Sequence, residues 1–349
     1  MSPLQAGDGV PPISVQAVEP PVLSVVVPCY NESDNVDTLF ARLESVLDAL
    51  GETYEIVCVD DGSRDDTLAR LAAHHERNPA IKVVGLARNF GKEIALTAGI
   101  DHAAGQAVVP IDADLQDPPE VIGQLVARWR DGFDVVYARR RSRQGESWVK
   151  RATANLFYRV IDRVSEVPIP RDTGDFRLMD RRVVEALKRL PERTRFMKGL
   201  FAWVGYRQTA IEYDRDPRLR GQTTWNYWRL WNFALEGITS FSTVPLRVWS
   251  YVGVLVSLVA LGLAGVLVIR GTDPDAPGYA SLMVAVLFLG GVQLISLGVL
   301  GEYLGRIYRE VKGRPLYLVR DRWGTAAAGD VDPFAGGAGL PPPAEVQRD

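Results

Sequence analysis

The hydrophobic pattern is strongly repetitive in the first part of the chain. From Val22 to about Tyr137, short apolar runs rich in β-branched residues alternate with stretches in which apolar residues recur at helical spacing. The runs predict strands at Leu23–Val27, Ile56–Asp60, Lys82–Leu86, Ala107–Ile111 and Asp134–Ala138. The stretches between them predict helices at Asp34–Leu50, Thr67–Glu76, Glu93–Ala103 and Glu120–Trp129. This alternation predicts an α/β fold with a mostly parallel sheet, helices on both faces, and ligands outside the carboxyl ends of the strands.

Two uncharged apolar runs in the last third predict membrane spans. They are Val248–Ile269 and Tyr279–Gly301, and a helix of roughly 22 residues is about 33 Å long, enough to cross a hydrocarbon core about 30 Å thick. A pair of buried core helices is the alternative. The connector is short and contains one basic residue, whereas more basic residues flank the outer ends of the hairpin: Arg247, Arg306, Arg309, Lys312 and Arg314. Positive flanks favour the cytoplasmic side, so both termini and the α/β domain are expected there.

The segments around these units complete the predicted organisation. Before the hairpin, Trp225, Trp228 and Trp231 share one face of a helix, which predicts an interfacial helix, with a packed core stripe as the alternative. The N-terminal residues lack the basic start and apolar core of a signal peptide. We therefore expect a disordered tail (1–21), an α/β domain (22–215), interfacial helices (216–245), two spans (246–302), a juxtamembrane segment (303–323) and a second disordered tail (324–349).

Composition narrows the classes of protein without identifying one. The formal net charge is -3, with 40 Lys+Arg against 43 Asp+Glu, and the mean hydropathy is near zero. This balance excludes a highly charged disordered chain and a histone-like nucleic-acid binder, so no nucleic-acid partner is expected. Two cysteines, Cys29 and Cys58, cannot form a disulfide framework, and their apolar surroundings predict buried free thiols.

The segment IDADLQDPPE, directly after a predicted strand, carries the strongest chemical signal. If the backbone stays extended, Asp112 and Asp114 present their carboxylates on the same side. Two such charges about 4 Å apart repel by roughly 4 kcal/mol at an effective dielectric constant of 20, a cost that a hard divalent cation removes. Mg²⁺ and Mn²⁺ combine one or two carboxylates with substrate phosphate oxygens. The pattern predicts a metal–diphosphate site, with Gln116 as a further oxygen ligand.

Polar groups also follow the other strands. The first strand runs into Pro28, Tyr30 and Glu32, and the second into Asp60 and Asp61. Carboxylates there can accept hydrogen bonds from a nucleobase and from ribose hydroxyls, while a tyrosine can pack on the base; a turn followed by a helix cap explains the second cluster equally well. After the third strand, Arg88 and Lys92 are candidate phosphate partners. The chain has no Gly-x-Gly-x-x-Gly or Walker lysine motif, which disfavours a dinucleotide or P-loop site.

A basic stretch follows the predicted sheet. It contains Arg139, Arg140, Arg141, Arg143, Lys150 and Arg151 with one acid, Glu146. Such a stretch can be a solvated surface or lie on anionic lipid, where each basic residue contributes about 1 kcal/mol. Guanidinium groups also match the geometry of a phosphate monoester, which would place a phosphate-binding site between the metal site and the membrane.

Taken together, the motifs resemble those of family 2 glycosyltransferases. The segments are SVVVPCYNE, VDDGSRDDT, LARNFGKE, DADLQDPPE, GDFRLMDR and GQTTWNYWRLWNFALEGITSFS, followed by the two spans. They are most similar to the polyprenyl-phosphate glycosyltransferases, which include bactoprenol glucosyltransferases and dolichol-phosphate mannose synthases. The resemblance extends from about Leu23 to Leu318 and implies a GT-A-like, Rossmann-like fold followed by interfacial helices and a transmembrane hairpin.

The resemblance also implies roles for individual residues. The residues expected to bind the donor are Pro28, Tyr30, Glu32, Asp60, Asp61, Lys92 and Asp112. Those expected to bind the metal are Asp112, Asp114 and Gln116. Those expected to bind the acceptor phosphate are Arg140, Arg151 and Asn155, and the expected catalytic residues are Asp112, Asp114, Asp175 and Arg177. One departure stands out: relatives often carry a lysine where this chain has Thr224, so a cation facing the diphosphate is missing or is supplied by Arg218 or Arg220.

These expectations combine into a hypothesis about function. The chain would be an inverting glycosyltransferase of a bacterial cytoplasmic membrane, moving a hexose from a nucleotide sugar, UDP-glucose first, to a polyprenyl phosphate with Mg²⁺ or Mn²⁺. GDP-mannose and UDP-N-acetylhexosamines are alternative donors, and a homo-oligomer, with a tetramer as one form, is expected. Rival classes are a processive polysaccharide synthase, a cytoplasmic nucleotidyltransferase, and a non-catalytic membrane scaffold or nucleotide-sugar sensor.

Overall fold

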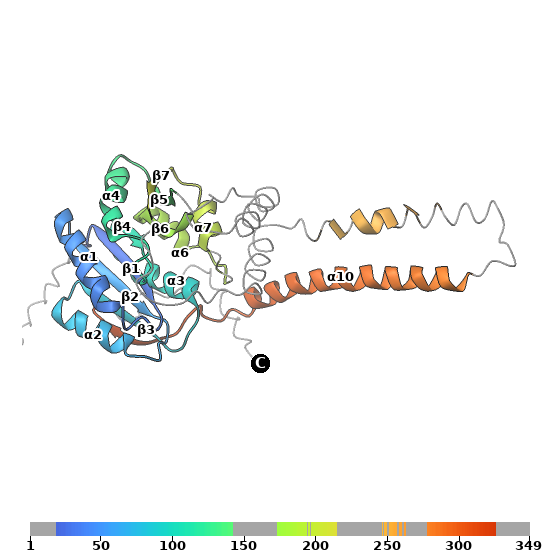
Figure 1. Cartoon of the computed structure of the whole chain (residues 1–349), viewed down its shortest axis with the longest axis horizontal. Helices are drawn as coiled ribbons and strands as arrows, with labels where there is room; N and C mark the ends of the chain where they lie inside the picture. Colours follow the sequence, from blue (N-terminus) through green and yellow to red (C-terminus); the bar gives the residue numbers. More distant parts are fainter. Residues whose placement is uncertain are drawn as a thin grey trace, which may run out of the picture.

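The sheet is the centre of the molecule. The computed structural model describes residues 19–141, 173–193, 195, 197–214, 246, 248–249, 251–256, 258–259, 262 and 278–325. The strands are β1 (Leu23–Cys29), β2 (Tyr54–Asp60), β3 (Ile81–Leu86), β4 (Ala107–Pro110), β5 (Val135–Arg140), β6 (Thr173–Asp180), β7 (Gln208–Tyr213) and β8 (Val319–Trp323). They lie in the order β7-β5-β6-β4-β1-β2-β3-β8 (Figure 1). Only the pairings of β6 and β8 are antiparallel, which confirms the mostly parallel sheet.

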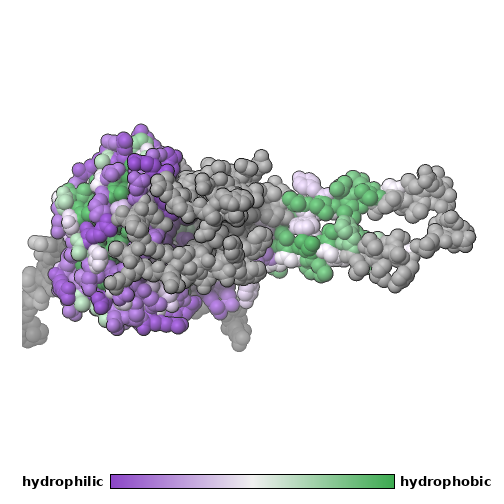
Figure 2. All heavy atoms as spheres, viewed as in Figure 1, coloured by the Kyte–Doolittle hydropathy of each residue, from purple (hydrophilic) through white to green (hydrophobic). Residues whose placement is uncertain are grey.

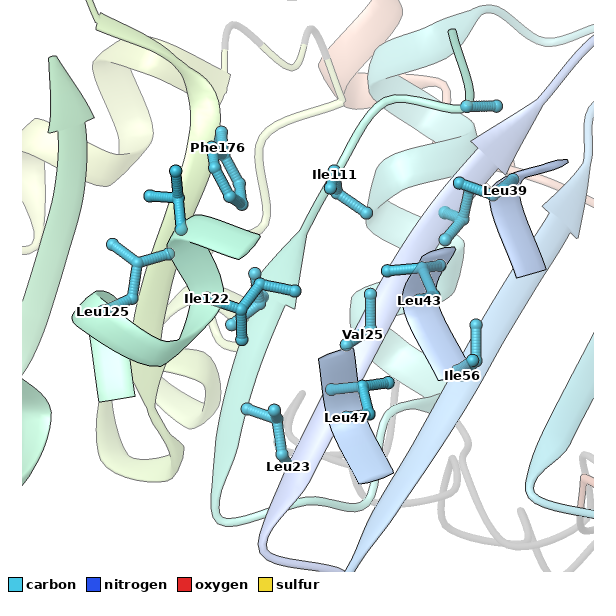
Figure 3. Packing of buried hydrophobic residues seen from close by; sticks show 14 of the residues in the cluster. Leu23, Val25, Leu39, Leu43, Leu47, Ile56, Ile111, Ile122, Leu125 and Phe176 are labelled. Carbon is cyan, nitrogen blue, oxygen red and sulfur yellow. The ribbon is translucent and has the colours of Figure 1, made fainter. Parts of the chain in front are cut away.

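Helices cover both faces of this sheet, as predicted. One face packs against α1 (Val36–Leu50), α2 (Thr67–Arg77), the 3₁₀ turn η1 (Pro119–Val121) and α4 (Ile122–Arg130). The other packs against α3 (Lys92–His102), α6 (Arg181–Lys188) and α7 (Met197–Trp203). Because successive strand residues point to opposite faces, Val25 and Val27 enter the first core and Val26 enters the second. Figure 3 shows Leu43 and Leu47 of α1 against Val25 of β1.

The predicted strands and helices before residue 141 all form, with ends that shift by a few residues. The strongest departure is in the helix predicted at Glu120–Trp129, which opens as a 3₁₀ turn at Pro119 before α4 begins. Cys29 and Cys58 are buried free thiols, also as predicted. The remaining described elements of the domain were not predicted from the sequence: β6, β7, β8, α6 and α7.

The C-terminal segment returns to the sheet. Residues 303–323 were expected to be juxtamembrane, but Val319–Trp323 form β8, which pairs with the edge strand β3. Trp323 lies opposite Val83 and packs against the core, and the Tyr317 hydroxyl donates to Asp101 at the end of α3 over 3.0 Å. The segment that follows the long helix is therefore part of the α/β domain.

Replacing Trp323 by alanine should destabilise the α/β domain. The side chain is partly buried against the core, so we expect a loss of about 1–3 kcal/mol, below the 3–5 kcal/mol typical of a fully buried tryptophan. Thermal unfolding in detergent, followed by circular dichroism, measures it. Arg320→Ala, on the exposed side of the same strand, is the control. Equal stability of the two variants would mean that β8 contributes little to the fold.

One long helix projects from the domain (Figure 1). Helix α10 (Tyr279–Val311) has 33 residues and would extend about 50 Å. Figure 2 shows hydrophobic residues along the projecting part and a largely hydrophilic face on the domain. Within the described residues, Phe288–Val311 is the one helix long and apolar enough to cross a membrane, with a mean hydropathy of 1.3. Of the other predicted span, Val248–Ile269, only scattered positions are described, and all of them are helical.

Candidate active site

The predicted site residues converge at one edge of the sheet. The strand order β4-β1-β2-β3, with all three pairings parallel, brings the carboxyl ends of these four strands to the same edge of the sheet. Pro28 lies within β1, Asp60 ends β2, Lys92 begins α3 and Asp112 follows β4. As expected from the position of ligands outside the carboxyl ends of parallel strands, these residues, predicted to bind the donor or the metal, lie at the same edge of the sheet.

The loops after β1 and β2 are tied to each other. The backbone N–H of Asn31 donates to the Ser63 hydroxyl over 2.9 Å, and the N–H of Arg64 donates back to the Asn31 side chain over 2.9 Å. Asn31 has a φ of 54°, a left-handed conformation that asparagine tolerates better than most residues. Beside it, Tyr30 is 40 % exposed. The tie fixes the loop and leaves the tyrosine ring accessible for packing on a base.

The two acids at the end of β2, Asp60 and Asp61, hold neighbouring loops. Asp60 accepts the N–H of Ser63, and Asp61 accepts those of Phe90 and Gly91 over 2.7 and 2.9 Å. Both carboxyl groups are buried, and burial raises the pKa of each. Gly62 has a φ of 66°, and a Cβ there would lie 2.5 Å from the Arg88 backbone. Asp61 therefore fixes the start of α3, the helix that carries Lys92.

Lys92 bridges two carboxylates at the centre of the site. Its Nζ lies 2.7 Å from Asp112 Oδ1 and 2.9 Å from Asp175 Oδ2. Asp112 leaves β4 and Asp175 lies on β6, so the ammonium group joins α3 to two neighbouring strands. The structure thus places Asp175, expected from the resemblance alone, beside two residues predicted from their positions after the strands.

Burial and the neighbouring charges shift the pKa values of Lys92, Asp112 and Asp175. Burial would lower the pKa of Lys92, but Asp112 and Asp175 outweigh it and raise that pKa well above its ordinary value. Burial raises the pKa of Asp112, and Lys92 only partly opposes this. Burial also favours a higher pKa for Asp175, yet the charges of Lys92 and Lys198 hold it below its ordinary value. Asp175 is thus the more firmly ionised of the two acids.

Arg177 lies behind Asp175 and is 4 % exposed. Its Nη2 donates to the Gly174 carbonyl over 2.8 Å, and its guanidinium carbon lies 4.0 Å from the centre of the Phe201 ring. Burial lowers the pKa of Arg177 to about 10, against the opposing effect of Asp175. From this position Arg177 can hold Asp175 in place electrostatically.

Glu93 is a buried acid that sequence reasoning missed. It follows Lys92 on α3, and its Oε2 is buried with no hydrogen-bond partner. Burial raises its pKa to about 8, and the charge of Asp175 adds to the effect. In sequence it looks like an ordinary acid in the first turn of a helix, and only the packing of α7 against the start of α3 makes it unusual.

Replacing Glu93 by glutamine should stabilise the protein in a pH-dependent way. Below about pH 4.5 the wild-type acid is protonated in both states, so the two proteins should match. As the pH rises towards 8, ionisation favours the unfolded wild type, and the advantage of the variant should grow to the order of a few kcal/mol. Thermal unfolding between about pH 5 and 9 measures it, with the exposed Glu76→Gln as control. A pH-independent difference would contradict the raised pKa.

The Asp112–Gln116 segment departs from its predicted shape. An extended backbone was expected, but Ala113 and Asp114 form a turn and Leu115 has a φ of 54°. The Asp114 carboxylate accepts the N–H of Gln116 over 3.2 Å, and Leu115 is fully buried, which anchors the strained loop. The presentation of Asp112 and Asp114 is therefore set by a turn and not by strand alternation.

Asp112 and Asp114 suit a divalent cation whose coordination is completed by oxygen atoms of a bound ligand. Among the described residues, no three His, Cys, Asp or Glu side chains gather closely enough to hold a metal by themselves. Asp112 and Asp114 nevertheless supply hard oxygen donors, and the contact of Asp112 with Lys92 shows that a cation is favourable there. Mg²⁺ commonly takes one or two carboxylates and completes its coordination with phosphate oxygens and water.

The predicted acceptor residues are only partly within the described structure. Arg140 ends β5, and its Nε lies 3.4 Å from the Tyr213 hydroxyl on β7. That hydroxyl donates to Asp117, directly after the predicted metal loop. Arg151 and Asn155 lie outside the described residues, as do Thr224, Arg218, Arg220 and the interfacial helix. The contact between Asp117 and Tyr213 could not be predicted from the sequence, because Tyr213 ends β7, a strand that was not predicted.

Comparison with known proteins gives consistent results. Residues 24–188 match the family described as Glycosyl transferase family 2, and residues 244–307 match the one described as GtrB C-terminal hairpin. A chain from Synechocystis sp. described as an uncharacterized glycosyltransferase is 66% identical over 304 residues, which cover 86% of this chain and 96% of that one. A bactoprenol glucosyl transferase of Shigella flexneri is 47% identical over 300 residues, covering 85% and 97%.

Solved structures are more distant. Glucosyl-3-phosphoglycerate synthase from Mycobacterium tuberculosis, in complex with Mn²⁺, uridine diphosphate and phosphoglyceric acid, is 22% identical with a TM-score of 0.45. The match covers 63% of this chain and 76% of that one.

Proposed function

The chain belongs to glycosyl transferase family 2, and from this membership we propose that it transfers glucose from a nucleotide sugar, UDP-glucose first, to a polyprenyl phosphate. The observation that carries the proposal is the extent of the similarity to bactoprenol glucosyl transferases. At 46–47% identity it covers 97–99% of those proteins, so it includes both the α/β domain and the region of the predicted hairpin. A GT-A-like domain with a lipid acceptor accounts for both parts.

The donor would lie across the carboxyl ends of β1, β2 and β4. Tyr30 is exposed and would pack on the base, while Asp60, at the end of β2, and Glu32 would accept hydrogen bonds from the nucleoside. The diphosphate would lie at Asp112 and Asp114, within reach of the Lys92 ammonium group. A Mg²⁺ or Mn²⁺ ion held by Asp112, Asp114 and Gln116 would supply Lewis-acid stabilisation of the leaving nucleoside diphosphate. Asp61 would act indirectly, by holding the loop that begins α3.

The acceptor supplies its own nucleophile. A phosphate monoester carries about -1.5 to -2 charge at neutral pH, so attack by its oxygen needs no strong general base. Arg140, with Arg151 and Asn155, would hold this phosphate, and positioning would be the main contribution to rate. Asp175, kept ionised by Lys92 and Lys198, would hold the Lys92 ammonium group in the site, while Arg177 holds Asp175 in place. Direct attack would invert the anomeric centre.

The location follows from the direction of α10. This helix leads into β8, so its basic end and the α/β domain lie on the same side of any membrane that it crosses. The residues Arg306, Arg309, Lys312 and Arg314 favour the cytoplasmic side for that end. We therefore propose a bacterial cytoplasmic-membrane enzyme with two spans and a cytoplasmic catalytic domain. A homo-oligomer, a tetramer included, is a further proposal that light scattering in detergent would test.

A donor panel tests the proposed function. The purified protein is incubated with polyprenyl phosphate and, separately, with labelled UDP-glucose, GDP-mannose and UDP-N-acetylglucosamine, and the lipid fraction is analysed by mass. We expect a product one hexose heavier than the acceptor, formed fastest from UDP-glucose. Long polymer would favour a processive synthase, another preferred donor would change the sugar, and no label in lipid with any donor would overturn the proposal.

A further inference from the structure

Arg140 and the Asp112–Asp117 loop are joined by a hydrogen-bond relay through Tyr213. In the parallel pairing of β5 with β7, Arg140 lies directly opposite Tyr213, so the two side chains share a face of the sheet. The Tyr213 hydroxyl lies 3.4 Å from Arg140 Nε and 2.5 Å from Asp117 Oδ1. Two of the three groups are nearly inaccessible, since Tyr213 is 5 % exposed and Asp117 3 % exposed.

The direction of the relay is fixed by chemistry. A guanidinium group can only donate hydrogen bonds and a carboxylate can only accept them, so the hydroxyl must accept from Arg140 and donate to Asp117. A hydrogen bond from a hydroxyl group to a carboxylate belongs to the strong, charge-assisted class. The ring of Tyr213 is held from the side by Phe176, whose centre lies 6.0 Å away at 81°. The hydroxyl therefore has one favourable orientation.

The relay joins two sites that must be held in register. Asp117 follows Gln116 in the same strained loop that carries Asp112 and Asp114. Arg140 belongs to the proposed acceptor site, and with its Nε directed to Tyr213 its two terminal amino groups can bind phosphate oxygens. Burial would lower the pKa of Arg140, but the Tyr213 hydroxyl, followed by the charges of Asp117 and Asp112, outweighs it and raises that pKa. The cation is thus coupled to the loop electrostatically and by hydrogen bonds.

We propose that Tyr213 and Asp117 are positioning residues that fix Arg140, and with it the acceptor phosphate, relative to the loop that holds the donor diphosphate. The proposal rests on the proposed function. Neither residue needs to touch a substrate: the hydroxyl sets the distance between the nucleophile and the reacting carbon, on which a bimolecular transfer depends steeply. A side chain that only supported the fold would affect donor and acceptor alike.

Tyr213→Phe is the sharpest test, because it removes only the hydroxyl. We expect kcat/KM for polyprenyl phosphate to fall about tenfold to hundredfold, the range for a lost hydrogen bond to a charged group, while KM for the nucleotide sugar changes less than about twofold. Asp117→Asn should act in the same direction. Because both changes break one relay, the double variant should lose little more than the worse single variant. Glu212→Gln, at the exposed Arg139–Glu212 pair of the same two strands, is the control.

The outcomes separate the relay from the function on which it rests. If the wild-type protein transfers no sugar to lipid, the proposed function fails. If the wild type is active and Tyr213→Phe matches it, or if the donor KM rises as much as the acceptor KM, the relay proposal is overturned. Should Tyr213→Phe fail to fold, Asp117→Asn with the same two KM values decides the question, and unchanged acceptor kinetics in that variant would equally refute it.

Discussion

Replacing Asp114 by asparagine is expected to abolish glycosyl transfer and leave the α/β domain folded. The carboxylate is half-buried at a turn beside Asp112, and asparagine keeps an oxygen that can still accept the Gln116 N–H. The change therefore preserves the loop but removes one negative charge from the proposed metal–diphosphate site. Stabilising a leaving diphosphate through a metal is worth several kcal/mol, so the rate should fall on the order of a thousandfold or more.

The measurement follows labelled hexose into lipid at increasing Mg²⁺ or Mn²⁺. Wild-type activity should be lost with a chelator and restored by added metal, whereas Asp114→Asn should stay inactive at metal concentrations that saturate the wild type. Asp131→Asn, an exposed acid in the loop after α4, serves as the matched control and should keep full activity. Undiminished turnover by Asp114→Asn would remove the metal-site assignment while leaving the family membership intact.

The part of the fold that could be predicted is the part with locally consistent signals. The strands β1 to β4 are buried on both faces by helices, so they read as short, continuous β-branched runs that are easy to recognise. Charged residues interrupt the other strands: Asp175 and Arg177 alternate along β6 and lie at the site, and three consecutive charged residues occupy the middle of the edge strand β8. Nothing local indicates that the chain returns to the sheet after α10.

The candidate site divides in the same way. Asp60, Lys92 and Asp112 could be placed from sequence because they lie at the end of a strand or in the segment after it, and the carboxyl ends of these strands share one edge. Glu93 and Tyr213 could not, because their properties arise from neighbours far away in the chain: α7 buries the first, and Asp117 engages the second. The turn at Asp114 was also missed, since the buried anchor Leu115 gives no signal for a left-handed conformation.

Replacing Lys92 by methionine is expected to lower turnover strongly while making metal binding easier. The ammonium group bridges Asp112 and Asp175, and in the loaded enzyme we expect it to face the charge that develops on the leaving diphosphate. Loss of one such group typically costs on the order of a hundredfold or more in kcat. The same change frees the Asp112 carboxylate of a competing cation, so half-maximal activity should need less Mg²⁺ than in the wild type.

A catalytic role for Lys92 predicts that both kcat and the Mg²⁺ concentration for half-maximal activity fall in Lys92→Met. A lysine that merely stabilised the domain would, when removed, lower the unfolding temperature without reducing the metal requirement. Lys92→Arg keeps a cation but not its compact shape, so it should retain part of the turnover and a wild-type metal requirement. Lys188→Met, on α6 and bonded to the Asp101 carbonyl, controls for the loss of a lysine elsewhere on the same side of the sheet. A variant with unchanged kcat would show that Lys92 only neutralises Asp112 and Asp175, and transfer would then depend on Asp112, Asp114 and the acceptor arginines without it.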